Sequence, residues 1–363
     1  MKIVHIIPSL NYGGLQKFSI DLTNTLSEEG NEVYLVVLDQ DRKKTMKSFC
    51  SNKLKLIFIR RNGLKIDVRV FGTLYKAVSE IQPDVVHTHG ISLFYSIKLI
   101  IAGKIKFIHT VHNLAYKEAG RIRIFINGIL FNYFKVQPVS ISDEVDDSFQ
   151  KCYPYSKVIK IYNGLVQPAK TKSFELAYST IEMFKKSDNT RVLINVGRID
   201  EQKNQKLLIS SYLKLREKYK NICLLIIGDL GEDNPLFEEI KIYNDTSGIH
   251  FLGVVENVYD YLLCSDIFCL SSKYEGLPIS LLEALSAGKI CACTPAGGVS
   301  SVLSNRLGYV SHDFTIKDYY NTLELALNNT YNISSDTLIR LFNKNYTMDK
   351  CCREYMRIYH GKQ

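Results

Sequence analysis

The sequence predicts an α/β protein built from two parallel-sheet domains. Short apolar, β-branched runs alternate with amphipathic helical patterns, and this alternation breaks at residues 167–173 (QPAKTKS) before it starts again. The chain has 363 residues, which is enough for two domains that each bury a core. Strands that alternate with crossover helices form parallel sheets covered on both faces, so we expect two such sheets.

The two halves contain separate series of predicted elements. The strands are KIVHIIP, EVYLVVL, LKLIFIR, DVVHTH, KFIHTVH and VQPVSIS in the first half and RVLINVG, ICLLIIGD, IHFLGVV and DIFCLSS in the second. The helices include LQKFSIDLTNTLSEEG, NQKLLISSYLKLREKY, NPLFEEIKIYND, ENVYDYLLC and ISLLEALSAG, and ICACTPAGG is predicted to be a turn. We therefore expect domains at 1–167 and 168–340, with a C-terminal helix in 341–363 that returns to pack on the first domain.

The composition is typical of a globular protein in a reducing compartment. The apolar runs are too short to cross a bilayer, and the apolar run of residues 3–7 predicts a first strand and is too short for a signal peptide. The nine cysteines include no C-x-x-C pair, which favours the cytoplasm. Residues 1–165 hold 23 Lys and Arg against 14 Asp and Glu, and residues 166–363 hold 23 of each, so the whole net charge of +9 lies in the first half. This asymmetry indicates an anionic partner for that half.

Loops at the carboxyl ends of parallel strands are where ligands bind in such sheets. Gly13 and Gly14 follow the first strand and open a helix, so their N–H groups could approach a phosphate, although such a turn can also be purely structural. Arg198 and Lys203 follow the first strand of the second half. They could hold a diphosphate, or form a solvated charge cluster with the two carboxylates between them.

Four histidines follow two neighbouring strands as the pairs His87 with His89 and His109 with His112. Histidines in this pattern can begin a metal site of a hydrolase, which would also need carboxylates from adjacent loops. Asp143 is the only obvious candidate for such a carboxylate. We therefore expect hydrogen-bonding roles for one or two of these imidazoles, with the metal site as the alternative.

The segment SSKYEGLPISLLEALSAGK (271–289) carries two carboxylates in an apolar helical context. Pro278 suits the first turn of a helix and Gly288 the position after its end, so Glu283 lies on a largely buried helix. A buried carboxylate needs partners, and we expect Glu283 to have them unless it is a surface residue near the helix end.

Six motifs fall in order over nearly the whole chain: the GG loop, TVHN (110–113), IYNG (161–164), VGRIDEQKN (196–204), HFLGVV (250–255) and EGLPISLLEALSAG (275–288). With them the chain resembles family 4 of the retaining glycosyltransferases. The most specific motif is the last, in which seven residues separate two glutamates. The resemblance implies the GT-B fold, in which two Rossmann-like, doubly wound parallel-sheet domains face each other across a cleft.

The resemblance also implies roles for individual residues. The residues at the reacting centre would be Glu275 on the donor sugar, His112 near its reacting carbon, and Arg198 and Lys203 on the diphosphate. The other donor-binding residues would be Glu283 on the ribose, the Gly14 amide on the β-phosphate, Val254 and Val255 near the base, the amides of Gly276 and Leu277 near the sugar and phosphate, and Gly197. Two departures, Gln16 and Ser301 where the family often has glutamate, leave the donor sugar open.

The implied reaction is the metal-independent transfer, with retention, of a hexose or N-acetylhexosamine from a nucleotide-diphosphate sugar. A UDP-sugar is expected as donor and a glycan or lipid-linked carrier as acceptor, in capsular, exopolysaccharide or lipopolysaccharide assembly. No cofactor or metal is expected, because no D-x-D pair follows a strand and the cations hold the diphosphate. The rivals are an epimerase or phosphorylase of the same fold, a metal-dependent hydrolase that uses His87, His89, His109 and His112, and a basic module that binds nucleic acid or a membrane and has no enzymatic activity.

The basic first half suggests a membrane surface, and no nucleic-acid partner is expected. Residues 121–135 (RIRIFINGILFNYFK) form a predicted helix with one broad apolar face, Ile122, Phe125, Ile126, Ile129, Leu130 and Tyr133. This face either packs on the core or docks on anionic lipid together with Arg60, Arg61, Arg121 and Arg123. The second alternative places the protein in the cytoplasm, peripherally on the inner face of the plasma membrane.

Overall fold

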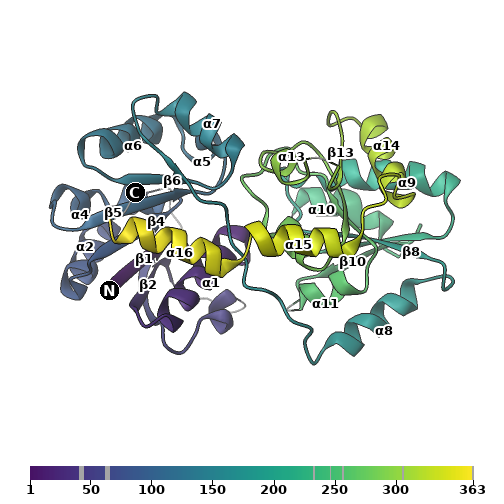
Figure 1. The fold of residues 1–363 in the computed structure, drawn as a ribbon, viewed down its shortest axis with the longest axis horizontal. Helices are drawn as coiled ribbons and strands as arrows, with labels where there is room; N and C mark the ends of the chain where they lie inside the picture. The colour runs from purple at the N-terminus through teal and green to yellow at the C-terminus, as the bar shows by residue number, and fades with distance from the viewer. Residues whose placement is uncertain are drawn as a thin grey trace. The chain divides into compact units, whose positions relative to one another are not determined.

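The computed structural model describes residues 1–40, 45–61, 66–231, 234–245, 247–255, 257–304 and 306–361 (Figure 1). It divides into two compact units. The first unit comprises residues 1–166 together with the C-terminal segment from Tyr346 onward, and the second comprises Gln167–Asn345. The predicted boundary after residue 167 lies within one residue of the division.

The first unit is a parallel sheet with helices on both faces (Figure 1). Its elements are β1 (Lys2–Ile7), α1 (Gly14–Glu28), β2 (Glu32–Asp39), the 3-10 helix η1 (Met46–Phe49), β3 (Lys55–Arg61), α2 (Arg69–Ile81), β4 (Val85–His89), α3 (Ser92–Tyr95), α4 (Ile97–Ile101), β5 (Lys106–Val111), α5 (Ala115–Glu118), α6 (Arg121–Tyr133), β6 (Gln137–Ser140), α7 (Asp143–Cys152), β7 (Ile159–Lys160) and α16 (Met348–Tyr359).

The first sheet has the strand order β3-β2-β1-β4-β5-β6-β7. Its central strands are covered on both faces, which is why they are almost continuously apolar: Ile3, Val4, Ile6 and Ile7 of β1 are fully buried. The order reverses between β1 and β4, which pair in parallel with His5 opposite His87. Ligands of doubly wound sheets bind beyond the strand ends at such a reversal.

The C-terminal helix α16 belongs to the first unit. Leu165 donates its N–H to the carbonyl of Tyr346 (2.9 Å), and Met348 donates its N–H to the carbonyl of Leu165 (3.0 Å). Gly164 of the IYNG motif allows this contact, because a Cβ there would lie 2.8 Å from both Met348 Cα and the Thr347 carbonyl. The preceding helix reaches Asn345 within the second unit, so the return starts at Tyr346 and not at residue 341.

The second unit repeats the architecture with six parallel strands in the order β10-β9-β8-β11-β12-β13. Its elements are α8 (Phe174–Phe184), β8 (Arg191–Val196), α9 (Gln205–Lys218), β9 (Ile222–Ile227), α10 (Pro235–Ile240), the 3-10 helix η2 (Lys241–Tyr243), β10 (Ile249–Gly253), α11 (Val258–Leu263), β11 (Ile267–Leu270), α12 (Ile279–Ser286), β12 (Ile290–Cys293), α13 (Val299–Val302), β13 (Tyr309–Val310), α14 (Ile316–Leu327) and α15 (Ser335–Asn345).

The prediction of two doubly wound parallel sheets is confirmed, and one element was assigned wrongly. The segment ICACTPAGG was predicted to be a turn, but its first four residues form β12, which pairs with β11 and β13. Small side chains conceal this strand in the sequence, and burial between its neighbours reveals it, since Cys291, Ala292 and Cys293 are fully buried. In the described part of the chain, no helix is long and apolar enough to cross a membrane.

Candidate active site

The second sheet reverses its strand order between β8 and β11, and the loops after these two strands contact each other. Lys203, from the loop after β8, and Glu275, from the loop after β11, form an ion pair with 2.6 Å between Nζ and Oε1. Their side chains are only 16% and 7% exposed. The prediction placed each residue at a strand end, and the structure brings the two together as a buried charged pair.

Further polar contacts fix Glu275 in place. Ser272 donates its hydroxyl to Oε1 of Glu275 (2.6 Å), and the Gln202 side-chain amide lies 3.4 Å from Oε2. The same amide donates to the carbonyl of Tyr274 (3.0 Å), so the loop after β8 also holds the backbone beside the carboxylate. Gln202 and Ser272 were not among the predicted site residues, although Gln202 lies in the motif VGRIDEQKN and Ser272 in the segment 271–289.

Glycines let the backbone approach these side chains. Gly297 has φ +56°, and a Cβ there would lie 1.8 Å from the Glu275 carbonyl oxygen, so this position accepts only glycine. Gly197 lies beside Lys203, whose Cδ and Cε would be 3.3 Å from an added Cβ. Gly276 is buried, and its carbonyl accepts the Gly298 N–H (2.9 Å).

Arg198 differs from Lys203 in its exposure. Its side chain is 54% exposed, and Nη2 lies 3.2 Å from Oδ2 of Asp200. A guanidinium at this edge can turn toward an anionic ligand at little cost, because an exposed ion pair contributes little to stability. Arg198 and Asp200 thus form an exposed ion pair, whereas Lys203 is buried and pairs with Glu275.

The two glutamates of the segment 271–289 lie in different environments. Glu283 on α12 is only partly buried, and the buried carboxylate is Glu275, which is 6% exposed. Around Glu283 the helix is apolar and buried, as predicted, and Gly288 follows it with φ +65°. Leu277 is buried, while Val254 is 45% exposed and Val255 partly buried beyond the end of β10.

In the first unit, Gly14 starts α1 and His112 follows β5. Phe18, one turn into α1, packs edge-on against the partly buried His112 ring, with 5.4 Å between ring centroids. The backbone N–H groups of His112 and Asn113 both donate to Oε2 of Glu118, at 2.7 and 3.0 Å. Glu118 thus fixes the loop that carries His112.

Three of the four predicted histidines join a hydrogen-bonded series that the sequence did not reveal. Nε2 of His112 lies 2.8 Å from Nδ1 of His89, and Nε2 of His89 lies 3.1 Å from Nδ1 of His5. His5 is in the middle of β1, and its Nε2 lies 3.3 Å from the hydroxyl of Tyr359 on α16. Alternating strand residues point to one face of a sheet, which is why these rings meet.

The series continues through the other partner of Tyr359. This hydroxyl lies 2.7 Å from Nδ1 of His87, whose Nε2 lies 2.7 Å from the Thr110 hydroxyl, which lies 2.8 Å from the Tyr355 hydroxyl. We call this series the histidine–tyrosine chain; its members are His112, His89, His5, Tyr359, His87, Thr110 and Tyr355. Burial lowers the pKa values of His5 and His112 to about 3 and those of His87 and His89 well below the usual range, so the rings are neutral.

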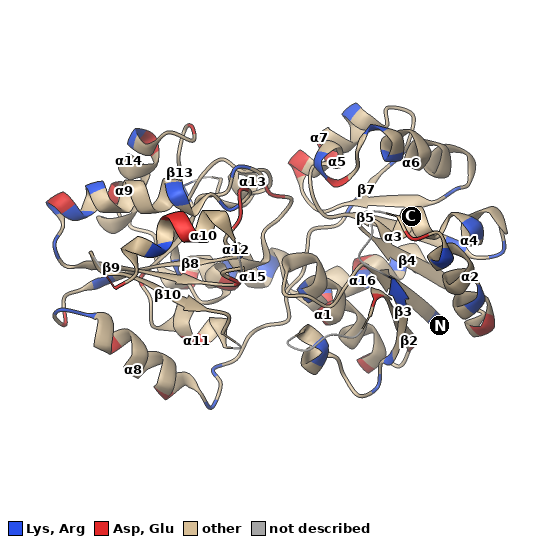
Figure 2. Cartoon of the chain, turned by 180° about the vertical axis from the view of Figure 1, so that it is seen from behind, with Lys and Arg blue, Asp and Glu red and all other residues tan. Residues whose placement is uncertain are grey.

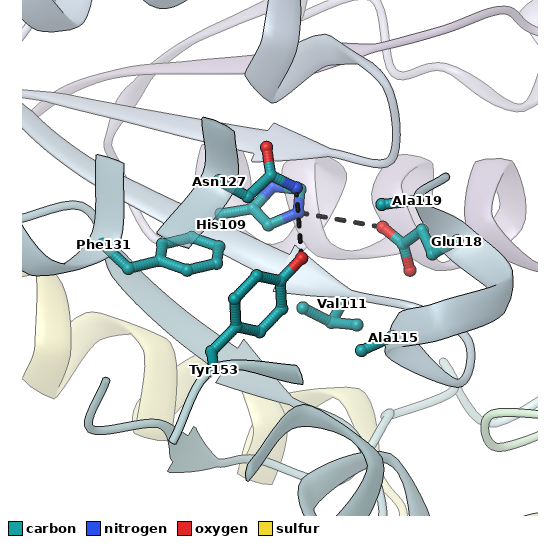
Figure 3. A pocket seen from close by; sticks show the side chains of 8 residues that line it. All are labelled: His109, Val111, Ala115, Glu118, Ala119, Asn127, Phe131 and Tyr153. Carbon is teal, nitrogen blue, oxygen red and sulfur yellow. Dashed lines mark hydrogen bonds and ion pairs between the residues drawn. The ribbon is translucent and has the colours of Figure 1, made fainter. Parts of the chain in front are cut away.

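His109 lies outside this chain, in a small pocket of the first unit (Figure 3). Its Nδ1 contacts the carbonyl of Thr88 (3.1 Å), and its Nε2 lies 3.7 Å from Oε1 of Glu118. Burial raises the pKa of Glu118 to about 7 and lowers that of His109 to about 3, so between these values both groups are neutral and no ion pair forms. Oε1 of Glu118 has no hydrogen-bond partner among the described residues.

These contacts bear on the alternative prediction that His87, His89, His109 and His112 form a metal site. The histidines whose nitrogens lie close enough to share an ion are His5, His87 and His89, and not the four predicted ones. The ring nitrogens of these three residues face hydrogen-bond partners within the chain. Asp143, the expected carboxylate, instead contacts Lys160 and the hydroxyl of Tyr162. The geometry therefore favours hydrogen bonding over metal binding.

The fold and this site define a class of protein: two doubly wound domains, with a buried lysine–glutamate pair and an exposed arginine at the strand-order reversal of the second. The family model of glycosyl transferases group 1 matches residues 180–340, and that of glycosyltransferase family 4 matches residues 12–166. The two matches cover most of both units, and the chain belongs to this family of glycosyltransferases.

Individual relatives agree with this assignment. An uncharacterised glycosyltransferase of Methanocaldococcus jannaschii is 33% identical over 59% of this chain and 56% of its own length. A UDP-Gal:α-D-GlcNAc-diphosphoundecaprenol α-1,3-galactosyltransferase of Escherichia coli is 22% identical over 95% of this chain and 91% of its own. The crystal structure of Anabaena HepE with UDP and glucose superimposes with a TM-score of 0.82 at 13% identity, covering 99% of each chain, which establishes the shared fold.

Proposed function

We propose that the protein transfers a hexose or N-acetylhexosamine from a UDP-sugar to a glycan or lipid-linked acceptor, with retention of anomeric configuration and without a metal. The observation that carries the proposal is the buried pair of Lys203 and Glu275 beside the exposed Arg198, at the reversal of the second sheet. The UDP-Gal donor and lipid-linked acceptor of the Escherichia coli relative support the substrate class.

The chemistry follows from the charges at this site. Departure of a nucleoside diphosphate leaves negative charge on the phosphate oxygens, and preorganised cations stabilise this charge in the transition state. Arg198 and Lys203 are the two cations, and each is already matched by a carboxylate in the structure. A bound diphosphate would compete with these carboxylates, and sugar hydroxyls would then donate to Glu275.

The remaining roles are proposed from the family resemblance. Glu283, partly exposed on α12, would accept hydrogen bonds from the ribose hydroxyls, and the backbone near Val254 and Val255 would contact the base. In the first unit, the Gly14 amide would contact the β-phosphate and His112 the sugar. The leaving phosphate would take the proton of the acceptor hydroxyl as this hydroxyl attacks from the face that the phosphate leaves.

A screen of nucleotide-sugar hydrolysis tests the donor, because slow hydrolysis requires no acceptor. We expect one UDP-sugar to be hydrolysed, with the α- or β-configuration of the donor kept in the first-formed product when followed by NMR. Activity should survive a strong chelator. Loss with EDTA and recovery with a divalent ion would refute metal independence, and an inverted product would refute retention.

Substitution of the two glutamates tests the site. Glu275→Ala should abolish turnover, whereas Glu283→Ala should weaken donor binding by about 1–3 kcal/mol because a charged hydrogen-bond acceptor is lost. Glu324→Ala removes a partly buried carboxylate of the same unit that is paired with Lys218, and it serves as the matched control. Donor affinity that is unchanged in Glu283→Ala would exclude its ribose contact.

Exposed apolar side chains and basic residues on α6 support a lipid-linked acceptor, and Figure 2 shows where the basic residues lie on this helix. Ile122, Phe125 and Tyr133 are 78%, 71% and 79% exposed, so the predicted apolar face is not wholly buried; Leu130 packs inward, with Asn127 and Phe131. Arg121 is exposed and Arg123 partly buried.

Arg60 and Arg61, the other two residues of the predicted membrane surface, are less suited to membrane contact. Arg60 is exposed, but Arg61 forms a 2.8 Å ion pair with Asp39 in which both side chains are less than one-fifth exposed. Residues 62–65, directly after Arg61, lie outside the described residues. The proposed membrane surface is therefore that of α6, with Arg60 as an additional exposed charge.

Sedimentation with vesicles of acidic phospholipid tests this surface. We expect salt-sensitive binding that is lost in Ile122→Ser with Phe125→Ser, since apolar insertion and basic attraction act together. Leu176→Ser with Met183→Ser is the matched control, because these residues on α8 are 66% and 75% exposed in the half without net charge. Failure to sediment at low salt would favour a soluble acceptor.

A further inference from the structure

The histidine–tyrosine chain has a direction that can be deduced by counting protons. A neutral imidazole has one N–H donor and one acceptor nitrogen, and a hydroxyl has a single proton to donate. In a series of such groups, an imidazole that donates to one neighbour must accept from the other, and a hydroxyl that accepted from both neighbours would leave its own buried O–H without an acceptor in the series. The six hydrogen bonds of the chain therefore run together either from Tyr355 toward His112 or from His112 toward Tyr355.

The two directions differ at the Tyr355 end. If the bonds run from His112, Thr110 donates to the Tyr355 oxygen, and the Tyr355 O–H is left without an acceptor among the described residues. Tyr355 is fully buried, so this unpaired donor carries the full cost of desolvation. If the bonds run from Tyr355, its O–H donates to Thr110, and the one donor of the chain that has no partner among the described residues is the Nδ1–H of His112, whose ring is only partly buried.

The favoured direction determines the proton of each ring. Thr110 donates to Nε2 of His87, and Nδ1–H of His87 donates to Tyr359. Tyr359 donates to Nε2 of His5, and each following Nδ1–H donates to the Nε2 of the next histidine. At the end of the chain, His112 accepts at Nε2 and therefore carries its proton on Nδ1.

The end at His112 is suited to a ligand. His112 is only partly buried, and no hydrogen-bond partner is recorded for its Nδ1 among the described residues. The other end is anchored, because Nζ of Lys106 contacts the carbonyl of Ile358 and lies 3.4 Å from that of Tyr359, which holds the last turn of α16 against β5. The histidine–tyrosine chain thus connects the anchored end of α16 to the partly buried His112 ring, which carries a donor at Nδ1.

We propose that Tyr355 and Tyr359 are positioning residues of the transferase: through the histidine–tyrosine chain they hold His112 in the Nδ1–H tautomer, so that it presents a hydrogen-bond donor to an oxygen atom of the substrate. The inference rests on the proposed function only for the identity of this substrate. It gives the C-terminal helix a part in the site beyond packing, and it makes His112 a donor and not a base.

Nitrogen-15 NMR of histidine-labelled full-length protein tests the proposal, because long-range couplings distinguish an Nδ1–H from an Nε2–H imidazole. The His112 signal is assigned by its absence in His112→Asn. We expect wild-type His112 to be entirely Nδ1–H. In Tyr359→Phe, which keeps the ring and removes the O–H, no donor enforces the direction and both tautomers of His112 should appear.

Tyr95→Phe is the matched control. Tyr95 is a buried tyrosine of the same unit whose hydroxyl accepts the Asp67 N–H (3.2 Å), and it lies outside the chain. This variant should leave the His112 signal unchanged. Thr110→Val, which keeps the β-branched shape, interrupts the chain at a second link and shows whether an effect depends on Tyr359 alone.

Several outcomes would overturn the inference. They are an Nε2–H or doubly protonated His112 in the wild type, a His112 signal that Tyr359→Phe does not alter while the variant keeps its circular dichroism and melting temperature, or histidine signals that shift when a chelator is added. The kinetic arm is separate: Tyr359→Phe should lower kcat with little change in the KM for the donor. Absence of any transferase activity would refute the proposed function and leave the tautomer result standing.

Discussion

Both units bury polar side chains where the strand order of the sheet reverses, and they compensate the cost of this burial in different ways. In the second unit, the reversal between β8 and β11 holds a charged pair, Lys203 and Glu275, 2.6 Å apart. In the first, the reversal between β1 and β4 holds His5, His87 and His89, whose pKa values are lowered by burial so that the rings are neutral. Opposite charges satisfy one site, and an uncharged hydrogen-bonded chain satisfies the other.

The difference corresponds to different chemical capacities. A buried charged pair can exchange partners with an ionic ligand, because the cation remains charged when the carboxylate moves away. A neutral chain cannot stabilise a leaving diphosphate, but it can orient a single donor. The comparison therefore indicates that the second unit interacts with the ionic part of a ligand and that the first unit orients a hydrogen-bond donor. Four predictions test this division.

The largest expected effect is acid destabilisation of the first unit. The pKa of His5 is about 3 in the fold against 6.5 unfolded, so its contribution to stability is complete above pH 6.5 and is lost as the pH falls toward 3. This amounts to about 1.4 kcal/mol for each pH unit and roughly 4–5 kcal/mol in total. Urea unfolding between pH 7 and 5 should show a smaller pH slope in His5→Asn than in the wild type.

His312→Asn, at an exposed site in the second unit, is the control and should keep the wild-type slope. Equal slopes in His5→Asn and the wild type would mean that His5 does not resist protonation in the fold.

The next effect comes from breaking the charged pair. Lys203→Met leaves Glu275 buried without its cation and should lower the free energy of unfolding by about 3–5 kcal/mol. Lys203→Met with Glu275→Gln should recover much of this stability but no activity, because the charge is absent from both residues. Chemical denaturation and donor hydrolysis measure the two properties.

Lys218→Met is the matched control for this pair. Lys218 and Glu324 form an ion pair of similar length, 2.8 Å, but the lysine side chain is 62% exposed, so its loss should have a much smaller effect. Equal losses in the two lysine variants would contradict the importance of burial.

A third effect has the opposite dependence on pH. The pKa of Glu118 is raised by burial from 4.5 to about 7, so its favourable contribution is complete below pH 4.5 and is lost as the pH rises through 7. The Glu118→Gln variant has no carboxyl group to ionise, so it avoids this loss of stability at high pH. Its amide oxygen can still accept hydrogen bonds from the N–H groups of His112 and Asn113. At pH 8 the variant should be more stable than the wild type by up to about 3 kcal/mol.

Melting temperatures at pH 5 and pH 8 measure this effect. The variant's advantage should shrink at pH 5, and a variant that is equally destabilised at both values would contradict the raised pKa.

The smallest effect concerns how α16 is held. Gly164→Ala places a methyl group 2.8 Å from the backbone at Thr347 and Met348, so the helix must shift, at a cost of about 1–3 kcal/mol. Gly120→Ala, where no atom lies within 4 Å of an added Cβ, is the control. If α16 positions the histidine–tyrosine chain, Gly164→Ala should also alter the His112 tautomer. Unchanged NMR signals would show that the packing of α16 at Gly164 does not determine this tautomer.

Much of the fold and part of the site could be predicted from the sequence. Apolar runs of strand length indicated the main strands, and the placement of Arg198, Lys203, Glu275 and His112 after strands follows from where the runs end. Strand β12 was missed because Ile290–Cys293 contains small residues that are also common in turns. The very short strands β7 and β13 carry too little pattern to be recognised.

The environments of individual side chains could not be predicted in the same way. Glu275 and Glu283 are both carboxylates in one apolar segment, and only the contact with the loop after β8 makes the first the buried one. His5 looks like an isolated polar residue in an apolar strand. It meets His87 because β1 and β4 are adjacent, which is a property of strand order.

The sequence by itself determined the two series of strands and helices, the loops at their carboxyl ends and the family motifs, because local periodicity and spacing encode them. Only the tertiary structure decided which of these residues pair. Tyr359 reaches His87 across 272 positions of sequence. No local pattern carries such a contact, since it depends on the order of the strands and on the docking of α16, and these depend on the burial of the chain as a whole.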